Sequence, residues 1–230
     1  MRIPTRHMER PFPFLGRPAL FVHTPKCGGS YVAAAIGRRR FARAPEQRHP
    51  RLRGHLTWIE YRDRLAEMGQ DVRDRLTISL VRNPWDWHLS WFNYIRADTG
   101  GRRSGHVLEH TLFQRFSFHD YIDWLEDPDA PRGPQGYIVR QLSDWFVDES
   151  GRIAVDHVLR QEHLADDLRR LARAEGLCLK LPRRRRNASR TAGARDWRPF
   201  YSDHDAERIA RRHARDIALF GYSFDPDPAR

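Results

Sequence analysis

Short apolar runs alternate along this chain with segments whose apolar residues recur at helical spacing. Three runs, Ala19 to His23, Leu76 to Arg82 and Val155 to Gln161, predict strands. A helical pattern comes after each of them in the chain. Strands that alternate with helices favour a parallel sheet, with ligands at the carboxyl ends of its strands. We therefore predict an α/β fold in three layers, with a central parallel sheet flanked by helices.

Local signals place the helices and their ends. Thr57 and Glu60 form a capping-box pattern, and Asn83 followed by Pro84 is typical of a helix start. Turn residues within 145–154 predict a hairpin. The predicted helices span Ser30 to Arg38, Thr57 to Met68, Pro84 to Ala97, Ser117 to Leu125, Leu164 to Ala174 and Asp203 to Phe220.

The length of the chain is consistent with one domain. Its 230 residues can build a single buried core, and no internal repeat is visible. We predict one domain over residues 1–230, with residues 1–17 as an extended, proline-broken N-terminal segment. No apolar run approaches the ~20 residues that cross a bilayer, so we expect no membrane span and a cytoplasmic location. Cys27 and Cys178 lack zinc or disulfide spacing, and we expect reduced thiols.

The charge balance is strongly basic. The 41 Lys and Arg residues outnumber 30 Asp and Glu residues, which gives a formal net charge of +11. Such a balance suits anionic partners, such as a nucleotide, an acidic glycan or a nucleic acid. No helix-turn-helix, zinc-ligand or RNA-binding pattern is evident, and we therefore expect no nucleic-acid partner. The run Arg183 to Arg186 is interpreted as a solvated loop. The sequence makes no prediction of the oligomeric state.

The segment Phe21 to Tyr31 carries the chemistry of an anion-binding loop. Gly28 and Gly29 let the backbone turn tightly and approach a ligand, while Lys26 adds a positive charge. The helix predicted from Ser30 directs its first N–H groups to the same place. A phosphate or sulfate is therefore expected here. The order of residues excludes a nucleoside-triphosphatase loop, whose lysine follows the last glycine.

A second strand-to-helix junction adds another anion site. Arg82 ends the second predicted strand, and Asn83 and Pro84 begin the next helix, with Asp86 in its first turn. Ser90 lies two turns into that helix. A guanidinium fork and a hydroxyl at this spacing can grip a phosphate. The alternative interpretation is a capped helix with a surface arginine.

Together the two junctions resemble the donor site of sulfotransferases that use 3′-phosphoadenosine 5′-phosphosulfate (PAPS), in particular the carbohydrate-type group. This resemblance implies a P-loop-like fold. It implies that Arg82 and Ser90 hold the 3′-phosphate. It also implies that the 5′-phosphosulfate is held by Pro25, Lys26, Cys27, Gly28, Gly29, Ser30 and Tyr31.

A third match lies near the C-terminus. Asn187 and Ser189 precede a last predicted helix that closes on Phe220 to Tyr222, which is similar to the ending of the same group. The resemblance implies that Asn187 and Ser189 reach the nucleotide. Two departures are visible, because Cys27 stands where Thr is more usual and Trp87 replaces a common arginine.

The resemblance further implies sulfuryl transfer from PAPS, without a metal ion, to a hydroxyl acceptor such as a carbohydrate or other small metabolite. Lys26 would meet the charge that develops on the leaving oxygen. His55, at the place where relatives carry their base, would take the acceptor's proton, with a carboxylate in the cleft as the alternative base. We expect His23 to orient the phosphate loop, His88 to face solvent or the cleft, and His213 to be a packing residue.

Two other functions stay as alternatives. A kinase-like phosphotransferase would use a related α/β core, although it should show a magnesium-binding residue beside its loop. A basic nucleic-acid-binding protein would use the positive charge alone.

Overall fold

The computed structural model describes residues 18–35, 49–98, 105–176, 181 and 196–225. The chain divides into two compact units. The first comprises Met1–Val81 and Ser143–Arg186, and the second comprises Arg82–Leu142 and Asn187–Arg230. The prediction of one domain stays a prediction. Within the described ranges, no helix is both long and apolar enough to cross a membrane.

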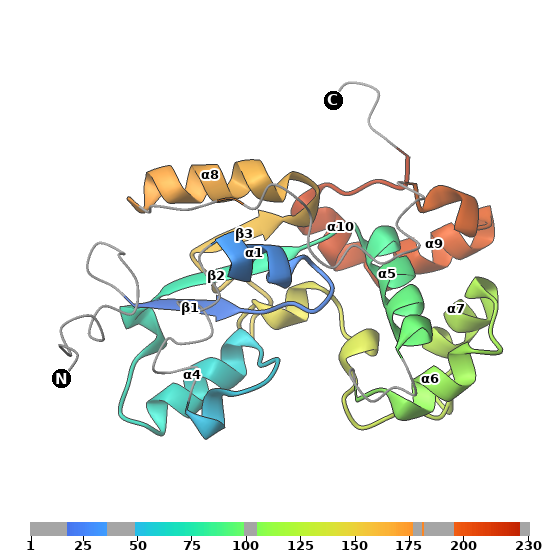
Figure 1. Ribbon diagram of the computed structural model, residues 1–230, viewed down its shortest axis with the longest axis horizontal. Helices are drawn as coiled ribbons and strands as arrows, with labels where there is room; N and C mark the ends of the chain where they lie inside the picture. Colours follow the sequence, from blue (N-terminus) through green and yellow to red (C-terminus); the bar gives the residue numbers. More distant parts are fainter. Residues whose placement is uncertain (1–17, 36–48, 99–104, 177–180, 182–195, 226–230) are drawn as a thin grey trace, which may run out of the picture. The chain divides into compact units, whose positions relative to one another are not determined.

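A small parallel sheet lies at the centre of the first unit (Figure 1). Its strands are β1 (Ala19–Val22), β2 (Leu76–Val81) and β3 (His157–Arg160), in the order β1-β2-β3. Phe21 is in register with Ile78, and Ile78 with His157. Every residue of β1 and β2 is buried, as expected for strands that read as uninterrupted apolar runs. The α/β class, with a parallel sheet flanked by helices, is confirmed.

Helices α1 (Gly29–Ala35), α4 (Trp58–Ala66) and α8 (Leu164–Ala174) accompany this sheet. α8 packs beside β3, and α4 is drawn on the other side of the strands in Figure 1. The predicted capping box is confirmed, because Thr57 Oγ1 accepts the Glu60 N–H at 3.2 Å and the Glu60 carboxylate accepts the Thr57 N–H at 2.7 Å. Short 3-10 turns are η2 (Pro50–Leu52), η3 (Val72–Asp74), η6 (Ser143–Trp145) and η7 (Gln161–His163).

The predicted hairpin is also present in the first unit. Val147 and Ile153 form an antiparallel bridge. The Asp148 N–H donates to the carbonyl of Arg152 at 2.9 Å, which closes the turn. The hairpin therefore joins η6 to the segment that leads into β3.

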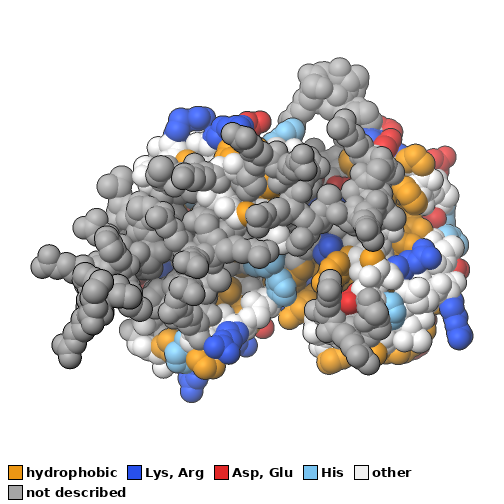
Figure 2. Space-filling model, viewed as in Figure 1, with side chains coloured by type: hydrophobic (Ala, Val, Ile, Leu, Met, Phe, Trp, Pro, Cys, Tyr) orange, Lys and Arg blue, Asp and Glu red, His pale blue; other side chains and the backbone are white. Residues whose placement is uncertain are grey.

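Part of the positive charge lies on α8. Figure 2 shows Lys and Arg side chains over this helix, which carries the exposed residues Arg169, Arg170 and Arg173. Arg169 pairs with Asp166 at 2.5 Å, and Arg170 pairs with Asp167. Acidic residues of the same helix therefore neutralise part of this face. The run Arg183 to Arg186 lies outside the described residues.

The second unit is helical in the part that the structure describes. The predicted helix at Pro84 is confirmed, since the Asn83 side chain accepts the Trp85 N–H at 3.1 Å at its first turn. Ser117 caps the predicted helix that follows it. The sequence pattern did not predict α6. The elements are α5 (Pro84–Ala97), α6 (Val107–Phe113), α7 (Phe118–Glu126), α9 (Asp203–Arg212), α10 (Ala214–Phe220), η5 (Tyr137–Val139) and η8 (Arg198–Phe200).

The prediction of one continuous helix from Asp203 to Phe220 is wrong. The backbone leaves helical geometry at His213, where φ is −105° and ψ is 25°, and α10 begins at the next residue. This break places the His213 ring in the core, where its Nδ1 lies 2.7 Å from the Asp216 carboxylate. The apolar residues keep their helical spacing across the break, so the sequence pattern alone did not reveal that the helix is interrupted.

His213 belongs to a chain of buried hydrogen bonds. His88 Nε2 lies 2.8 Å from His213 Nε2, and His88 Nδ1 lies 2.7 Å from the Tyr121 hydroxyl. At the other end, the Leu142 N–H donates to the Asp216 carboxylate at 2.9 Å. The four side chains are fully buried, and burial lowers the pKa of His88 well below its usual value. The expectation that His88 faces solvent or a cleft is therefore wrong.

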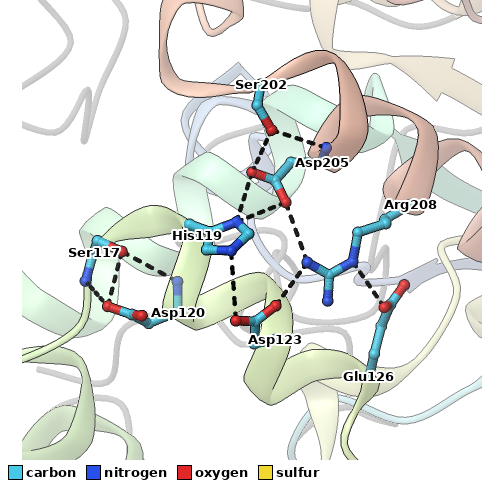
Figure 3. Close-up of polar contacts among 8 residues, drawn as sticks. All are labelled: Ser117, His119, Asp120, Asp123, Glu126, Ser202, Asp205 and Arg208. Carbon is cyan, nitrogen blue, oxygen red and sulfur yellow. Dashed lines mark hydrogen bonds and ion pairs between the residues drawn. The ribbon is translucent and has the colours of Figure 1, made fainter.

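A second polar cluster ties α7 to α9 (Figure 3). The Arg208 guanidinium donates to Asp123 at 2.7 Å, to Glu126 at 2.8 Å and to Asp205 at 3.2 Å. His119 Nδ1 lies 2.9 Å from the Asp205 carboxylate, and its Nε2 lies 3.6 Å from Asp123. Arg208 and Asp205 are buried, whereas His119 is exposed. Its hydrogen bond to Asp205 and the nearby carboxylates raise the pKa of His119.

Candidate functional site

The loop that follows β1 has an unusual backbone. Lys26 has a φ of 63° and is the one residue other than glycine with a positive φ in the described part of the chain. A side chain in this left-handed region costs roughly 1–3 kcal/mol, so surrounding contacts must hold it there. Gly28 follows with a φ of 94°, and its carbonyl accepts the Tyr31 N–H at 2.8 Å where α1 begins. The loop is therefore built to present Lys26 in one conformation.

Each glycine of the loop makes room for a particular neighbour. A Cβ on Gly29 would lie 2.1 Å from His23 Nε2, and one on Gly28 would lie 2.9 Å from a methyl carbon of Leu164. Both distances are closer than atoms without a bond between them can approach. The imidazole of His23 and the start of α8 therefore pack directly against the loop backbone.

Buried hydroxyls anchor the start of the loop to the central strand. Ser79 Oγ donates to the carbonyl of Val22 at 2.8 Å and lies 3.1 Å from Thr24 Oγ1. Since the Ser79 hydrogen is used in the first bond, Thr24 is the donor in the second. Thr24, Ser79 and the nearby Cys27 side chain are fully buried. The polar residues inside the apolar run of β2 were the sequence signal for this anchor.

His55 lies beside His23. Its Nδ1 is 3.2 Å from the His23 carbonyl oxygen, and the two rings have centroids 4.5 Å apart. Because a carbonyl can only accept, Nδ1 carries the hydrogen and the lone pair of the neutral ring lies on Nε2. Trp145 meets His55 edge-on, with centroids 6.2 Å apart. This arrangement leaves His55 half-buried, with the tautomer that a general base requires.

Both imidazoles are held in the neutral form. Burial, together with the adjacent His55, lowers the pKa of His23 to about 3. Burial also lowers the pKa of His55 below 6.5, although the hydrogen bond to the His23 carbonyl acts in the opposite direction. At neutral pH neither ring carries a charge, so the formal positive charge of this loop comes from Lys26.

In the second unit, Arg82 forms a two-pronged ion pair with Asp86. Arg82 Nε and Nη2 each donate to one oxygen of the Asp86 carboxylate at 2.7 Å. Asp86 also lies in the first turn of α5, as the sequence predicted, but its pairing with Arg82 was missed. The spacing of four residues was the available signal. Ser90 is half-buried one helical turn after Asp86, on the same face of α5.

Trp87 fills the position where the resemblance led us to expect an arginine. Its indole is fully buried, and its ring centroid lies 6.2 Å from that of Trp91 and 5.8 Å from that of His213. A charged side chain would be costly in this aromatic setting. The departure at this position is therefore accommodated by core packing.

The predicted site residues fall into three groups. Arg82 and Ser90 belong to the second unit, and Arg82 directly follows the last residue of β2. Asn187 and Ser189 lie outside the described residues. The first unit brings together, on or beside the loop after β1, Pro25, Lys26, Cys27, Gly28, Gly29, Ser30, Tyr31 and His55.

In the described part of the chain, no group of three or more His, Cys, Asp or Glu residues is arranged to hold a metal ion. Comparison of the sequence with protein-family models and with curated proteins finds no match. Any functional argument for this protein therefore depends on the chemistry of its own residues.

Proposed function

We propose that this chain is a PAPS-dependent sulfotransferase with a P-loop-like fold. The observation that carries the proposal is the loop after β1. There, Lys26 is held in a left-handed conformation beyond a buried hydroxyl anchor, and Gly28 and Gly29 lie in close contact with their neighbours. A lysine in a glycine-containing turn, whose backbone N–H groups can donate, suits a phosphosulfate. The neutral imidazole of His55, in the same unit, adds a base for the acceptor.

The proposed reaction assigns a separate task to each group. The bond between sulfur and the bridging oxygen breaks, and its electron pair stays on that oxygen, where Lys26 meets the developing charge. The acceptor oxygen forms the new bond to sulfur, and its proton passes to Nε2 of His55. The products are a sulfate ester and 3′,5′-adenosine bisphosphate. As in phosphoryl transfer, positioning and electrostatics supply most of the catalysis.

The donor's 3′-phosphate is assigned to Arg82 and Ser90. The bidentate contact with Asp86 fixes the plane of the Arg82 guanidinium, which suits a phosphate that must be bound in one orientation. Asn187 and Ser189 are proposed to contact the nucleotide as well. The acceptor is a hydroxyl compound, and the net charge of +11 favours an acidic glycan among the candidates.

Ligand-dependent thermal stability tests this function. Stabilisation by 3′,5′-adenosine bisphosphate, but not by magnesium-ATP or an oligonucleotide, supports the sulfotransferase, because a ligand that binds the folded state raises its stability. Stabilisation by magnesium-ATP alone selects a kinase-like enzyme, and stabilisation by the oligonucleotide alone selects a nucleic-acid-binding protein. Labelled PAPS presented with glycans, lipids, phenols and peptides then identifies the acceptor.

The substitution His55→Ala tests the proposed base. We expect binding of 3′,5′-adenosine bisphosphate to be kept and turnover to fall by about 10²–10⁴-fold. Because its pKa is lowered, the acidic limb of the wild-type pH profile should lie below pH 6.5 and vanish in the variant. His163→Ala removes an exposed histidine of the same unit and serves as the control. An unchanged rate and pH profile in the His55 variant would transfer the role of base to a carboxylate.

A further inference from the structure

His23 contacts two parts of the candidate site at once. Its imidazole occupies the space next to Gly29, where a Cβ would lie only 2.1 Å from Nε2. Its carbonyl oxygen accepts from His55 Nδ1 at 3.2 Å. One residue thus contacts both the phosphate loop and the proposed base.

The chemistry of His23 itself argues against a direct role in the reaction. Burial holds its ring neutral to about pH 3, so it cannot serve as an anion-binding charge at neutral pH. The ring also packs against Phe21, with centroids 5.3 Å apart, and against His55, with centroids 4.5 Å apart. Three neighbours, Phe21, Gly29 and His55, therefore restrain the ring.

We propose that His23 is a positioning residue that couples the phosphate loop to His55. Its packed ring holds the main chain at position 23, and the carbonyl held in this way selects the His55 tautomer with hydrogen on Nδ1. The lone pair of the His55 ring, which would take a proton, is thereby placed on Nε2. The part of this proposal that concerns catalysis rests on the proposed sulfotransferase function. The coupling between the two imidazoles does not.

The experiment measures the ring ¹⁵N and ¹³C signals of His55 during an NMR pH titration of the full chain. In the wild type we expect mainly the Nδ1–H tautomer and a pKa below 6.5. His23→Ala removes the ring but keeps a carbonyl at this position. We expect the pKa of His55 to rise toward 6.5, because water reaches the ring, and the second tautomer to become populated.

A matched control separates this effect from general loosening of the first unit. His157 is a half-buried histidine of β3 whose Nε2 lies 2.8 Å from Glu175. His157→Ala should leave the titration of His55 unchanged. If His23→Ala does not fold, as judged by circular dichroism, His23→Gln is measured instead, because it keeps more of the side-chain volume. An unchanged His55 tautomer and pKa in the folded His23 variant overturns the proposal.

Binding of 3′,5′-adenosine bisphosphate tests the other half of the coupling. We expect His23→Ala to weaken it by about tenfold or more, since Gly29 loses its packing partner. In His23→Ala/Gly29→Ala, the new methyl group occupies part of the vacated space, and binding should recover relative to Gly29→Ala alone. Loss of binding without a change at His55 refutes the coupling. If the wild type binds no bisphosphate, the sulfotransferase proposal fails, while the NMR result still decides the positioning role.

Discussion

Replacing His213 with alanine tests the energetic value of the buried polar chain in the second unit. In the variant, the Asp216 carboxylate keeps its hydrogen bond from the Leu142 N–H but loses the one from the His213 imidazole, at 2.7 Å. His88 also loses the partner that lies 2.8 Å from its Nε2. Because all three side chains are fully buried, bulk water cannot reach the groups left behind without opening the core.

The expected magnitude follows from the burial of the carboxylate. Removing a hydrogen-bond donor from a buried carboxylate costs about 1.5–3 kcal/mol, because the carboxylate oxygen loses a partner that water cannot replace. For a chain of this length, 1 kcal/mol shifts the melting temperature by about 2–4 °C. His213→Ala should therefore lower the melting temperature by about 3–12 °C. Cavity formation beside Trp87, whose ring centroid lies 5.8 Å from that of His213, adds to the loss.

Scanning calorimetry and circular dichroism measure the effect, with His204→Ala as the matched control. His204 is exposed on α9, so its loss should change the melting temperature little. A second comparison isolates the uncompensated charge. The double variant His213→Ala/Asp216→Ala should lose less stability than the sum of the losses in the two single variants. In the double variant no buried carboxylate is left without its imidazole partner. If His213→Ala behaves like the control, or if the two changes are additive, the reasoning is wrong.

Substitutions at three further places test the loop after β1, the phosphate assignment of Arg82 and Ser90, and the polar cluster between α7 and α9. Lys26→Ala should lower turnover by about 10²-fold with a smaller effect on donor affinity, measured by kinetics and calorimetry, while Lys26→Arg keeps the charge as a control. Arg82→Ala should weaken donors with a 3′-phosphate more than Ser90→Ala does, and equal losses with adenosine 5′-phosphosulfate would contradict the assignment. The pKa of His119 is raised in the folded state, so the protonated ring stabilises the folded protein. This contribution is fully present below pH 6.5 and is lost as the pH rises through the folded-state pKa. The melting-temperature difference between His119→Ala and the wild type should therefore shrink from pH ~5.5 to pH ~9, starting below about 1 kcal/mol because the ring is exposed.

Features encoded within a few residues were predictable from the sequence. The capping box at Thr57 and the Asn83 cap depend on side chains that reach only the next turn of the backbone, so their patterns specify the geometry. The buried strands β1 and β2 were equally clear, because continuous apolar runs suit a sheet covered on both faces. The tight turn expected at Gly28 is present as well, with a φ of 94°, whereas the anion binding expected of the loop stays a prediction.

Contacts between distant residues were not predictable in the same way. His88 and His213 are 125 residues apart, and helical spacing alone could not show that their rings meet. Nor could it show that the backbone breaks at His213, where α9 ends and α10 begins. The hydroxyl pair of Thr24 and Ser79 joins positions 55 residues apart. Such pairings depend on which elements become neighbours in the folded chain. Periodicity within one element contains no information about this.

The burial of Cys27 makes opening of the loop after β1 measurable. Its thiol is fully buried in the closed loop, so a thiol reagent can react only during local unfolding. In a background where Cys178 is replaced by serine, the alkylation rate divided by that of an unprotected cysteine would give the equilibrium for opening. A ligand that bridges the loop should slow this reaction in proportion to its occupancy. The cysteine found where the resemblance led us to expect threonine thus acts as a built-in kinetic reporter.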